Sequence, residues 1–167
     1  RDLQQGYCDA AIVATCNQTF DPASIAKMVA TVSPSQNGKP FTEGSDGHTY
    51  GEAVVSMLLA KTKGLFTIEN VVTKQCSVML PEGMPDTDAM IEAMRDTIGT
   101  LPVKDIGYVE LHGTGTQVGD MTEIEAVAKV YDAVFLGCSK GSYGNVFEAN
   151  TLLEILKVYY IIKNSIV

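Results

Sequence analysis

Short apolar runs alternate with amphipathic runs along most of the chain. The apolar runs that fit buried strands are residues 8–17, 52–61, 106–111 and 134–139, and a longer run at 65–80 fits one strand or two. Apolar residues three or four positions apart predict helices over 20–33, 86–99, 121–134 and 146–163. Strands that alternate with helices are typical of an α/β domain.

Local signals refine the ends of these elements. Asp21 is a candidate N-cap, and Pro22 stands in the first turn of its helix. Thr122 and Glu125 have the spacing of a capping box, which predicts that the third helix begins at about residue 121. Segments rich in glycine, proline and polar residues predict loops at 33–48, 81–88 and 140–145. We find no internal repeat and no linker, so we expect one domain over residues 1–167.

Composition and charge exclude several classes of function. The 167 residues are 46% hydrophobic, enough for a core, and 20 acidic against 12 basic side chains give a net charge of −8. No basic block offsets this charge, so we expect no nucleic-acid partner. The apolar runs fall short of the roughly 20 residues of a membrane span, and the first residues are polar, so we expect no membrane partner and a cytoplasmic location.

The cysteines give no sign of a metal or redox centre. They lie far apart and form no C-x-x-C pair: Cys8, Cys16, Cys76 and Cys138. We therefore interpret them as reduced thiols and expect neither a metal ion nor a cofactor.

One of the two histidines stands in a segment suited to chemistry, VELHGTGTQVGD, at residues 109–120. His112 follows the strand predicted at 106–111, and ligand crevices of open α/β sheets lie at the carboxyl ends of strands. Glycines allow close backbone approach to a ligand, and threonines offer hydroxyls: Gly113, Thr114, Gly115 and Thr116. A neutral imidazole there accepts a proton or donates a hydrogen bond to a developing enolate. The alternative is a histidine that only holds its own loop.

The segment HGTGTQVGDMTEIEAV, residues 112–127, resembles the H-G-T-G-T-x-x-G-D-x-x-E segment of β-ketoacyl synthases, the condensing domains of polyketide and fatty-acid synthases. Further segments are similar to the same family: CDAAIVA at 8–14, KPFTEGSDGHTYGEAVV at 39–55, DAMIEAMRDTIGTLPVKDIGYVELHGTGT at 88–116, and GCSKGSYGNVFEANTLLEILKV at 137–158. The resemblance covers nearly the whole chain. It implies an α/β fold with a partial thiolase-like, ketosynthase-type layered sheet and flanking helices.

The resemblance also implies site residues. The nucleophilic cysteine of the family belongs to a helix that would precede residue 1, so we expect a truncated domain that does not condense by itself. The first of the family's two histidines is matched by His112, and the second by Asn145. The lysine between them is matched by Lys140, and a glutamate of many members is matched by Glu154.

These matches predict non-covalent chemistry on a polyketide, a β-dicarbonyl compound or an acyl thioester. His112 would act as acid and base, with Asn145 as a second donor and Lys140 orienting or adding positive charge. The expected reactions are enolisation, dehydration, isomerisation or cyclisation, as in a polyketide-tailoring isomerase, cyclase or lyase. Thr114, Gly115, Thr116 and Glu154 are the candidate substrate contacts.

Other residues leave alternatives open. His48 stands where the family has an aromatic residue, and is either a second base or a solvated loop histidine. Cys138 is a substitute nucleophile or a buried thiol. Glu123 and Glu125 are interpreted as serving the helix cap and dipole.

Two alternatives to a tailoring enzyme also remain open. The chain is either a tailoring enzyme, a docking module for a polyketide synthase or acyl carrier protein, or one half of a split ketosynthase whose cysteine is on another chain. Because a partial ketosynthase sheet would leave apolar faces and edges uncovered, we expect a homodimer.

Overall fold

The computed structural model describes residues 2–18, 21–31, 34–35, 38–76 and 85–166. Two strands near the amino terminus, β1 (Ala10–Asn17) and β2 (Ala53–Ala60), pair antiparallel, whereas β3 (Tyr108–Glu110) and β4 (Phe135–Gly137) pair parallel. The helices are α1 (Asp2–Gln5), α2 (Pro22–Thr31), α3 (Thr87–Ile98), α4 (Gln117–Ala128), α5 (Lys140–Tyr143) and α6 (Asn150–Asn164), with short 3-10 turns at Val103–Asp105 and Phe147–Ala149. The predicted α/β class is confirmed.

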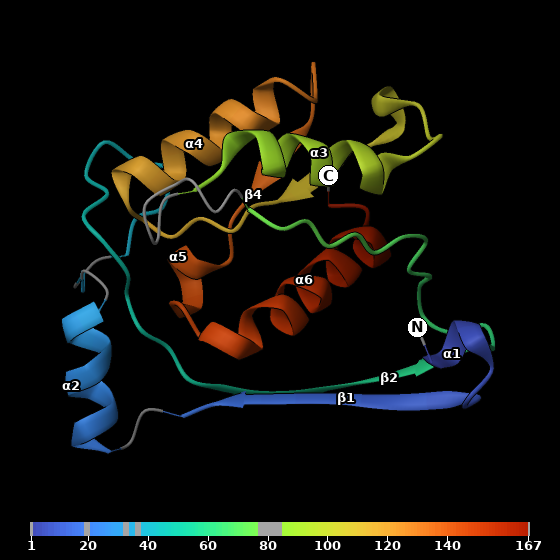
Figure 1. Cartoon of the computed structure of the whole chain (residues 1–167), viewed down its shortest axis with the longest axis horizontal. Helices are drawn as coiled ribbons and strands as arrows, with labels where there is room; N and C mark the ends of the chain where they lie inside the picture. Colours follow the sequence, from blue (N-terminus) through green and yellow to red (C-terminus); the bar gives the residue numbers. More distant parts are fainter. Residues whose placement is uncertain (1, 19–20, 32–33, 36–37, 77–84, 167) are drawn as a thin grey trace.

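The elements form layers (Figure 1). In this view α6 crosses the middle of the molecule, with β1 and β2 below it and α3 and α4 above it. Helix α6 contacts β2, and α3 contacts α4. In the same view the parallel pair β3–β4 lies between α6 and the two upper helices. The chain that leaves β4 leads to α5.

The β1–β2 pair has one exposed face that is mostly apolar. In the antiparallel register Ile12 stands opposite Leu58, and Cys16 stands opposite Val54. The exposed fractions of Ile12, Val54 and Leu58 are 75%, 69% and 67%. The two strands that apolar patterning predicts at 8–17 and 52–61 are therefore present, but no described residue covers this face.

The core lies among the later elements. Helix α3 begins where the Asp86 carboxylate accepts the Ala89 N–H, and it buries Ile91 and Ile98. The other buried apolar residues are Leu111, Ala126, Val127, Val146, Ala149 and Leu152. The helix predicted at 86–99 is confirmed, as is the helix after Asp21, whose carboxylate accepts the Ser24 N–H at 2.9 Å.

Helix α4 begins four residues before the predicted start. Its N-cap is Thr116, whose hydroxyl accepts the Gly119 N–H at 3.2 Å. The predicted capping box is wrong because Thr122 lies within the helix and donates to the Val118 carbonyl, while Glu125 pairs with Lys129.

Two further predictions of local structure need correction. Residues 65–76 form no strand; Leu65 and Val71 are 79% and 77% exposed, and no neighbouring strand lies beside them in the described part of the chain. The rest of that prediction, residues 77–80, lies outside the described residues. The predicted loop at 140–145 contains the short helix α5.

No helix within the described ranges is long and apolar enough to cross a membrane. Among the same residues, no group of three or more metal-ligating side chains could hold an ion. All four cysteines are free thiols.

Candidate functional site

The loop that carries His112 is fastened to α4 by Glu123. His112 follows β3 by two residues, and its backbone N–H donates to the Glu123 carboxylate at 2.6 Å. The N–H of Gly113 donates to the other oxygen of the same carboxylate at 2.9 Å. Glu123 is only 9% exposed, so the interpretation that it serves a helix cap is wrong. It orients the main chain of the histidine loop.

A second carboxylate joins this loop to residues 38–52. Asp120, at the start of α4, accepts the backbone N–H of Gly115 at 3.0 Å and that of Phe41 at 2.6 Å. It also accepts the hydroxyl of Ser45 at 3.3 Å. Beside it the Gly47 N–H donates to the Gly115 carbonyl at 2.8 Å. The two loops are therefore in direct contact immediately before His48.

Lys140 lies beneath His112 and is 4% exposed. It follows β4 as the first residue of α5, and its Nζ donates to the main-chain oxygen of His112 at 2.6 Å. The same Nζ pairs with the Glu154 carboxylate of α6 at 2.7 Å. Its distance to His112 Nδ1 is longer, 3.4 Å. Lys140 therefore links the strand-end loop to the central helix and brings positive charge to the imidazole.

His48 and Asn145 contact each other although they are 97 residues apart. Asn145 Nδ2 lies 2.7 Å from His48 Nδ1. The backbone of Asn145 is fixed by its N–H, which donates to the Thr49 carbonyl at 2.6 Å, and by its carbonyl, which accepts the Gly51 N–H at 3.0 Å. Asn145 is buried and His48 is half-buried. His48 is therefore packed beside Asn145 and is not a freely solvated loop histidine.

The electrostatic environment keeps both imidazoles neutral near pH 7. Burial lowers the pKa of His48, and the nearby His112 and Lys140 lower it further. The pKa of His112 is also lowered, first by burial of the imidazole away from water and then by the Lys140 ammonium, although the residue as a whole is exposed. Glu123, Glu154 and Asp120 oppose this effect at His112 without reversing it.

The predicted substrate contacts have mainly internal partners. The hydroxyls of Thr114 and Thr116 hydrogen-bond each other at 2.9 Å, and Thr116 caps α4. Gly115 is buried with a φ of 75°, and its carbonyl is taken by Gly47. Glu154 is the partner of Lys140. The structure thus brings Glu154 and Gly115 to the site, where their contacts support the loops.

Cys138 lies under the histidine loop. Its Sγ is 3.9 Å from the His112 carbonyl and 3.8 Å from that of Gly113. Burial raises the pKa of the thiol. A protonated, half-buried thiol is a poor nucleophile, and this disfavours the alternative in which Cys138 replaces the family cysteine.

Sequence reasoning missed Asn150, at the start of α6. Its Oδ1 accepts the buried N–H of Val146 at 3.1 Å, and its Nδ2 donates to Asn145 Oδ1 at 2.5 Å. Asn150 is 5% exposed. An asparagine close to the apolar pair Leu152 and Leu153 at the start of this helix was the signal available, because a buried amide needs partners.

Sequence reasoning also missed a polar cluster behind the loop. Glu110, in β3, accepts hydrogen bonds from the hydroxyls of Tyr108 and Ser139 and pairs with Lys157 of α6 at 2.7 Å. Although burial acts in the opposite direction, the hydrogen bonds from Lys157, Ser139 and Tyr108 lower the pKa of Glu110. This cluster anchors the strand that carries His112.

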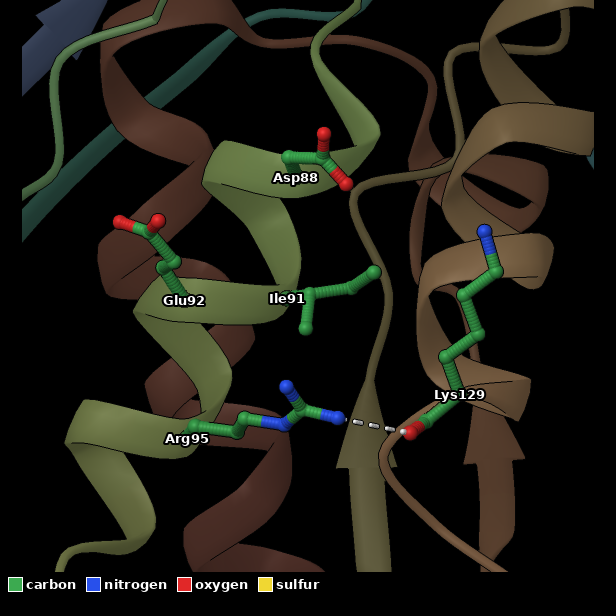
Figure 2. A pocket seen from close by; sticks show the side chains of 5 residues that line it. All are labelled: Asp88, Ile91, Glu92, Arg95 and Lys129. Carbon is green, nitrogen blue, oxygen red and sulfur yellow. Dashed lines mark hydrogen bonds between the residues drawn. The ribbon is translucent and has the colours of Figure 1, made fainter.

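Two grooves on the described surface contain no predicted site residue in their lining. The larger, about 480 Å³, is lined by Asp88, Ile91, Glu92, Arg95 and Lys129. Figure 2 shows these side chains, with Arg95 donating to the Lys129 carbonyl at 3.5 Å. The smaller, about 270 Å³, is lined by Asn17, Gln18, Ser24, Lys27, Met28, Phe147 and Glu148. His112 instead lies at an open surface.

Comparison with known families accounts for nearly the whole chain. Residues 1–64 match the N-terminal domain of β-ketoacyl synthases, and residues 67–167 match the C-terminal domain. The chain belongs to the β-ketoacyl synthase family. This confirms the resemblance carried by the His112 segment, and it makes the chain a ketosynthase-family domain related to those of polyketide synthases.

Curated relatives of this ketosynthase-family domain are fungal polyketide synthases. Prosolanapyrone synthase of Alternaria solani is 28% identical over an alignment that covers 99% of the chain and 7% of that protein. The non-reducing polyketide synthase adrD of Penicillium roqueforti is 29% identical over an alignment that covers 93% of the chain and 7% of that protein. The chain therefore spans only a small part of the length of these relatives.

Solved ketosynthases share the fold. The ketosynthase from module 6 of the bacillaene synthase of Bacillus subtilis 168 matches with a TM-score of 0.82 at 23% identity, over 98% of the chain and 32% of that structure. The ishigamide ketosynthase/chain length factor matches with a TM-score of 0.81 at 19% identity, over 98% and 43%. The fold is thus the thiolase-like, ketosynthase-type α/β fold that the sequence resemblance implied.

Proposed function

We propose that the ketosynthase-family site of this chain performs non-covalent acid–base chemistry on a polyketide or β-dicarbonyl thioester. His112 is the acid and base, Lys140 supplies positive charge, and Asn145 and His48 complete the site. The observation that supports this most strongly is the meeting of the two histidine loops across the Gly47–Gly115 hydrogen bond.

Enolisation is the step that this arrangement suits. Removal of a proton next to a thioester carbonyl places negative charge on the carbonyl oxygen, and fixed donors and cations stabilise that charge. A neutral imidazole is able to take or return the proton near pH 7, and the lowered pKa of His112 keeps it neutral there. His112 as a whole residue is exposed, which makes it accessible to a substrate held on a carrier. Dehydration, isomerisation and cyclisation of a β-dicarbonyl chain all begin with this step.

The names of the relatives support a choice of substrate class and partner. These are polyketide synthases by name, among them a highly reducing synthase of Penicillium soppii and a non-reducing synthase of Penicillium roqueforti. We therefore assign a polyketide-like acyl thioester as substrate and an acyl carrier protein or a polyketide synthase as the partner that presents it.

Solvent-deuterium exchange tests the proposal directly. The purified chain is incubated in deuterated buffer with the acetoacetyl thioester of N-acetylcysteamine, and the exchange of its α-protons is followed by NMR. We expect exchange above the buffer rate, and a loss of about 100-fold or more of that enhancement in His112→Ala. Glu125→Ala is the matched control, because Glu125 lies on α4 with an exposed carboxylate that pairs with Lys129. Equal rates in wild type and His112→Ala would refute the acid–base role.

The exposed face of β1–β2 supports a second proposal, that the chain associates with itself through this face. We propose that a second copy of the chain covers Ile12, Val54 and Leu58, giving a homodimer. Sedimentation at micromolar concentration is expected to show dimers that Leu58→Glu converts to monomers. Leu65→Glu is the control, because Leu65 is 79% exposed but lies outside both strands. A monomeric wild type would contradict this proposal.

A further inference from the structure

A chain of amide contacts leads from a buried backbone N–H to the imidazole of His48. Its first step is unambiguous, because Val146 is fully buried and its N–H is only a donor. The acceptor of that N–H is Asn150 Oδ1, at 3.1 Å. The amide of Asn150 is thereby oriented, and its Nδ2 faces Asn145.

The second amide is oriented by two donors. Asn145 Oδ1 accepts the Nδ2–H of Asn150 at 2.5 Å and the backbone N–H of Phe147 at 3.0 Å. Both partners are donors, so this atom must be the amide oxygen, and the Nδ2 group faces His48 Nδ1 at 2.7 Å. An amide NH₂ offers only hydrogens, so the imidazole nitrogen that meets it must offer a lone pair.

We propose that Asn150 is a positioning residue that acts through Asn145 to hold His48 as the Nε2–H tautomer, and that His48 serves the site as a hydrogen-bond donor and not as a second base. Its Nδ1 lone pair is used by Asn145, and its Nε2 carries the proton. The acceptor of the hydrogen bond from that Nε2–H is the carbonyl or enolate oxygen of a thioester. This last assignment rests on the function proposed above, whereas the tautomer does not.

The environment of His48 agrees with a neutral donor. Protonation at Nδ1 would place a second hydrogen against the Asn145 amide group. The charged and titratable neighbours are His112 and Lys140, which lower the pKa of His48, and Asp120, which raises it less. The ring of His112 has no such close partner among the described residues. Its Nδ1 lies 3.4 Å from Lys140 Nζ, which is closer to the His112 main-chain oxygen and to the Glu154 carboxylate.

Nitrogen-15 NMR of the imidazoles in the whole chain tests the tautomer without any substrate. The chain has two histidines, so a spectrum of His112→Ala assigns the signals of His48. We expect His48 in the wild type to carry its proton on Nε2 across the neutral range. A neutral His48 with the proton on Nδ1 would overturn the proposal.

Asn145→Asp is the strongest perturbation. One carboxylate oxygen still accepts from Asn150 and Phe147, but the other now faces His48 Nδ1 as an acceptor. We expect the His48 proton to move to Nδ1 and its pKa to rise by about 1 to 3 pH units. An unchanged tautomer and pKa in this variant would contradict the amide contact.

Asn150→Asp tests the positioning role itself. It keeps an acceptor for the Val146 N–H but replaces the donor to Asn145 with an oxygen, so the Asn145 amide is expected to turn and part of His48 to adopt the Nδ1–H form. Asn164→Ala is the control, because Asn164 is exposed at the other end of α6 and donates to the Tyr160 carbonyl, far from Asn145. A folded Asn150→Asp chain with the wild-type His48 spectrum would overturn the role of Asn150. Failure of the deuterium exchange would leave this result intact, and the reverse also holds.

Discussion

The two histidines of this ketosynthase-family domain are held in opposite ways. At His112 the main chain is fixed, by Glu123 on two backbone amides and by Lys140 on the carbonyl, while the residue as a whole is exposed. At His48 the ring itself is held, by Asn145. A ring with freedom suits a group that takes and returns a proton, and a ring with one nitrogen occupied suits a group that only donates.

The difference also separates positions that match the family's motifs from positions that differ from them. The supports of His112, namely Asp120, Glu123 and Lys140, stand at positions where the chain matches the resemblance to β-ketoacyl synthases. His48 and Asn145 stand where the chain departs from it. These two positions are in direct contact, Asn145 Nδ2 lying 2.7 Å from His48 Nδ1.

The largest expected effect is that of Lys140→Met, which removes the cation shared by both histidines. It leaves the Glu154 carboxylate partly buried without its partner, and loss of one member of a buried ion pair costs about 3–5 kcal/mol. Urea unfolding at pH 7 measures this loss. In the same variant the pKa values of His112 and His48 are expected to rise, because Lys140 lowers both. Lys129→Met, which breaks only an exposed pair, should change stability by less than about 0.5 kcal/mol.

Glu123→Ala is expected to disturb the loop that carries His112 and to leave His48 unchanged. Two backbone amides lose a charged acceptor, and we expect a loss of about 2–4 kcal/mol in the free energy of unfolding. The NMR signals of His112 should broaden or shift, while those of His48 keep the wild-type tautomer. Glu125→Ala, on the same helix, serves as reference. Equal losses in the two variants would show that Glu123 does not brace the loop.

Gly115→Ala separates the two loops from each other. Gly115 has a φ of 75°, and a Cβ there would collide with the Gly47 carbonyl oxygen. We expect a loss of about 1–3 kcal/mol in chemical denaturation and a change in the signals of both histidines. Gly107→Ala is the reference, because nothing lies within 4 Å of its Cβ position. Wild-type stability in Gly115→Ala would mean that the loops do not need this contact.

The smallest expected effect is that of pH. Both histidines have a folded pKa below their ordinary value of about 6.5. Below that pH the unfolded chain binds more protons at these histidines than the folded chain does. The free energy of unfolding is therefore highest above pH 6.5 and decreases as the pH falls below it. Thermal unfolding between pH 8 and pH 5 measures the decrease. In the double variant His48→Phe/His112→Gln this part of the decrease should disappear, and its persistence would assign the effect to other groups.

The spacing of apolar residues predicts those helices and strands that have one clear apolar face. The strands β1 and β2 and the helix α3 agree with apolar spacing, and the Asp21 cap agrees with its position. Patterning fails at 65–76, because an apolar run becomes a strand only when a neighbouring strand pairs with it. The predicted start of α4 is too late. Its N-cap, Thr116, lies within the glycine- and threonine-rich loop that carries His112, and that loop was interpreted only as a ligand site.

The site was predicted only as far as single positions allow. His112, Lys140, Asn145, Glu154 and His48 were named, and the structure brings them together. The role of Glu123 was missed because it depends on how the strand-end loop folds back on α4. The role of Asn150 was missed because its meaning depends on the orientation of a neighbouring amide, and spacing along the chain carries no information about that.

The Asp120 carboxylate has a consequence for the order in which the chain acquires its site. Its bond to Phe41 closes a loop of 79 residues, and the Asn145–His48 contact closes one of 97. Contacts so distant along the chain form slowly, after local helices and the β1–β2 pair. The histidine loops should therefore be the last region to assemble during refolding and the first to separate on heating, with the helices still intact. A sample judged native by its helical signal alone would then lack the arrangement that brings the two imidazoles together.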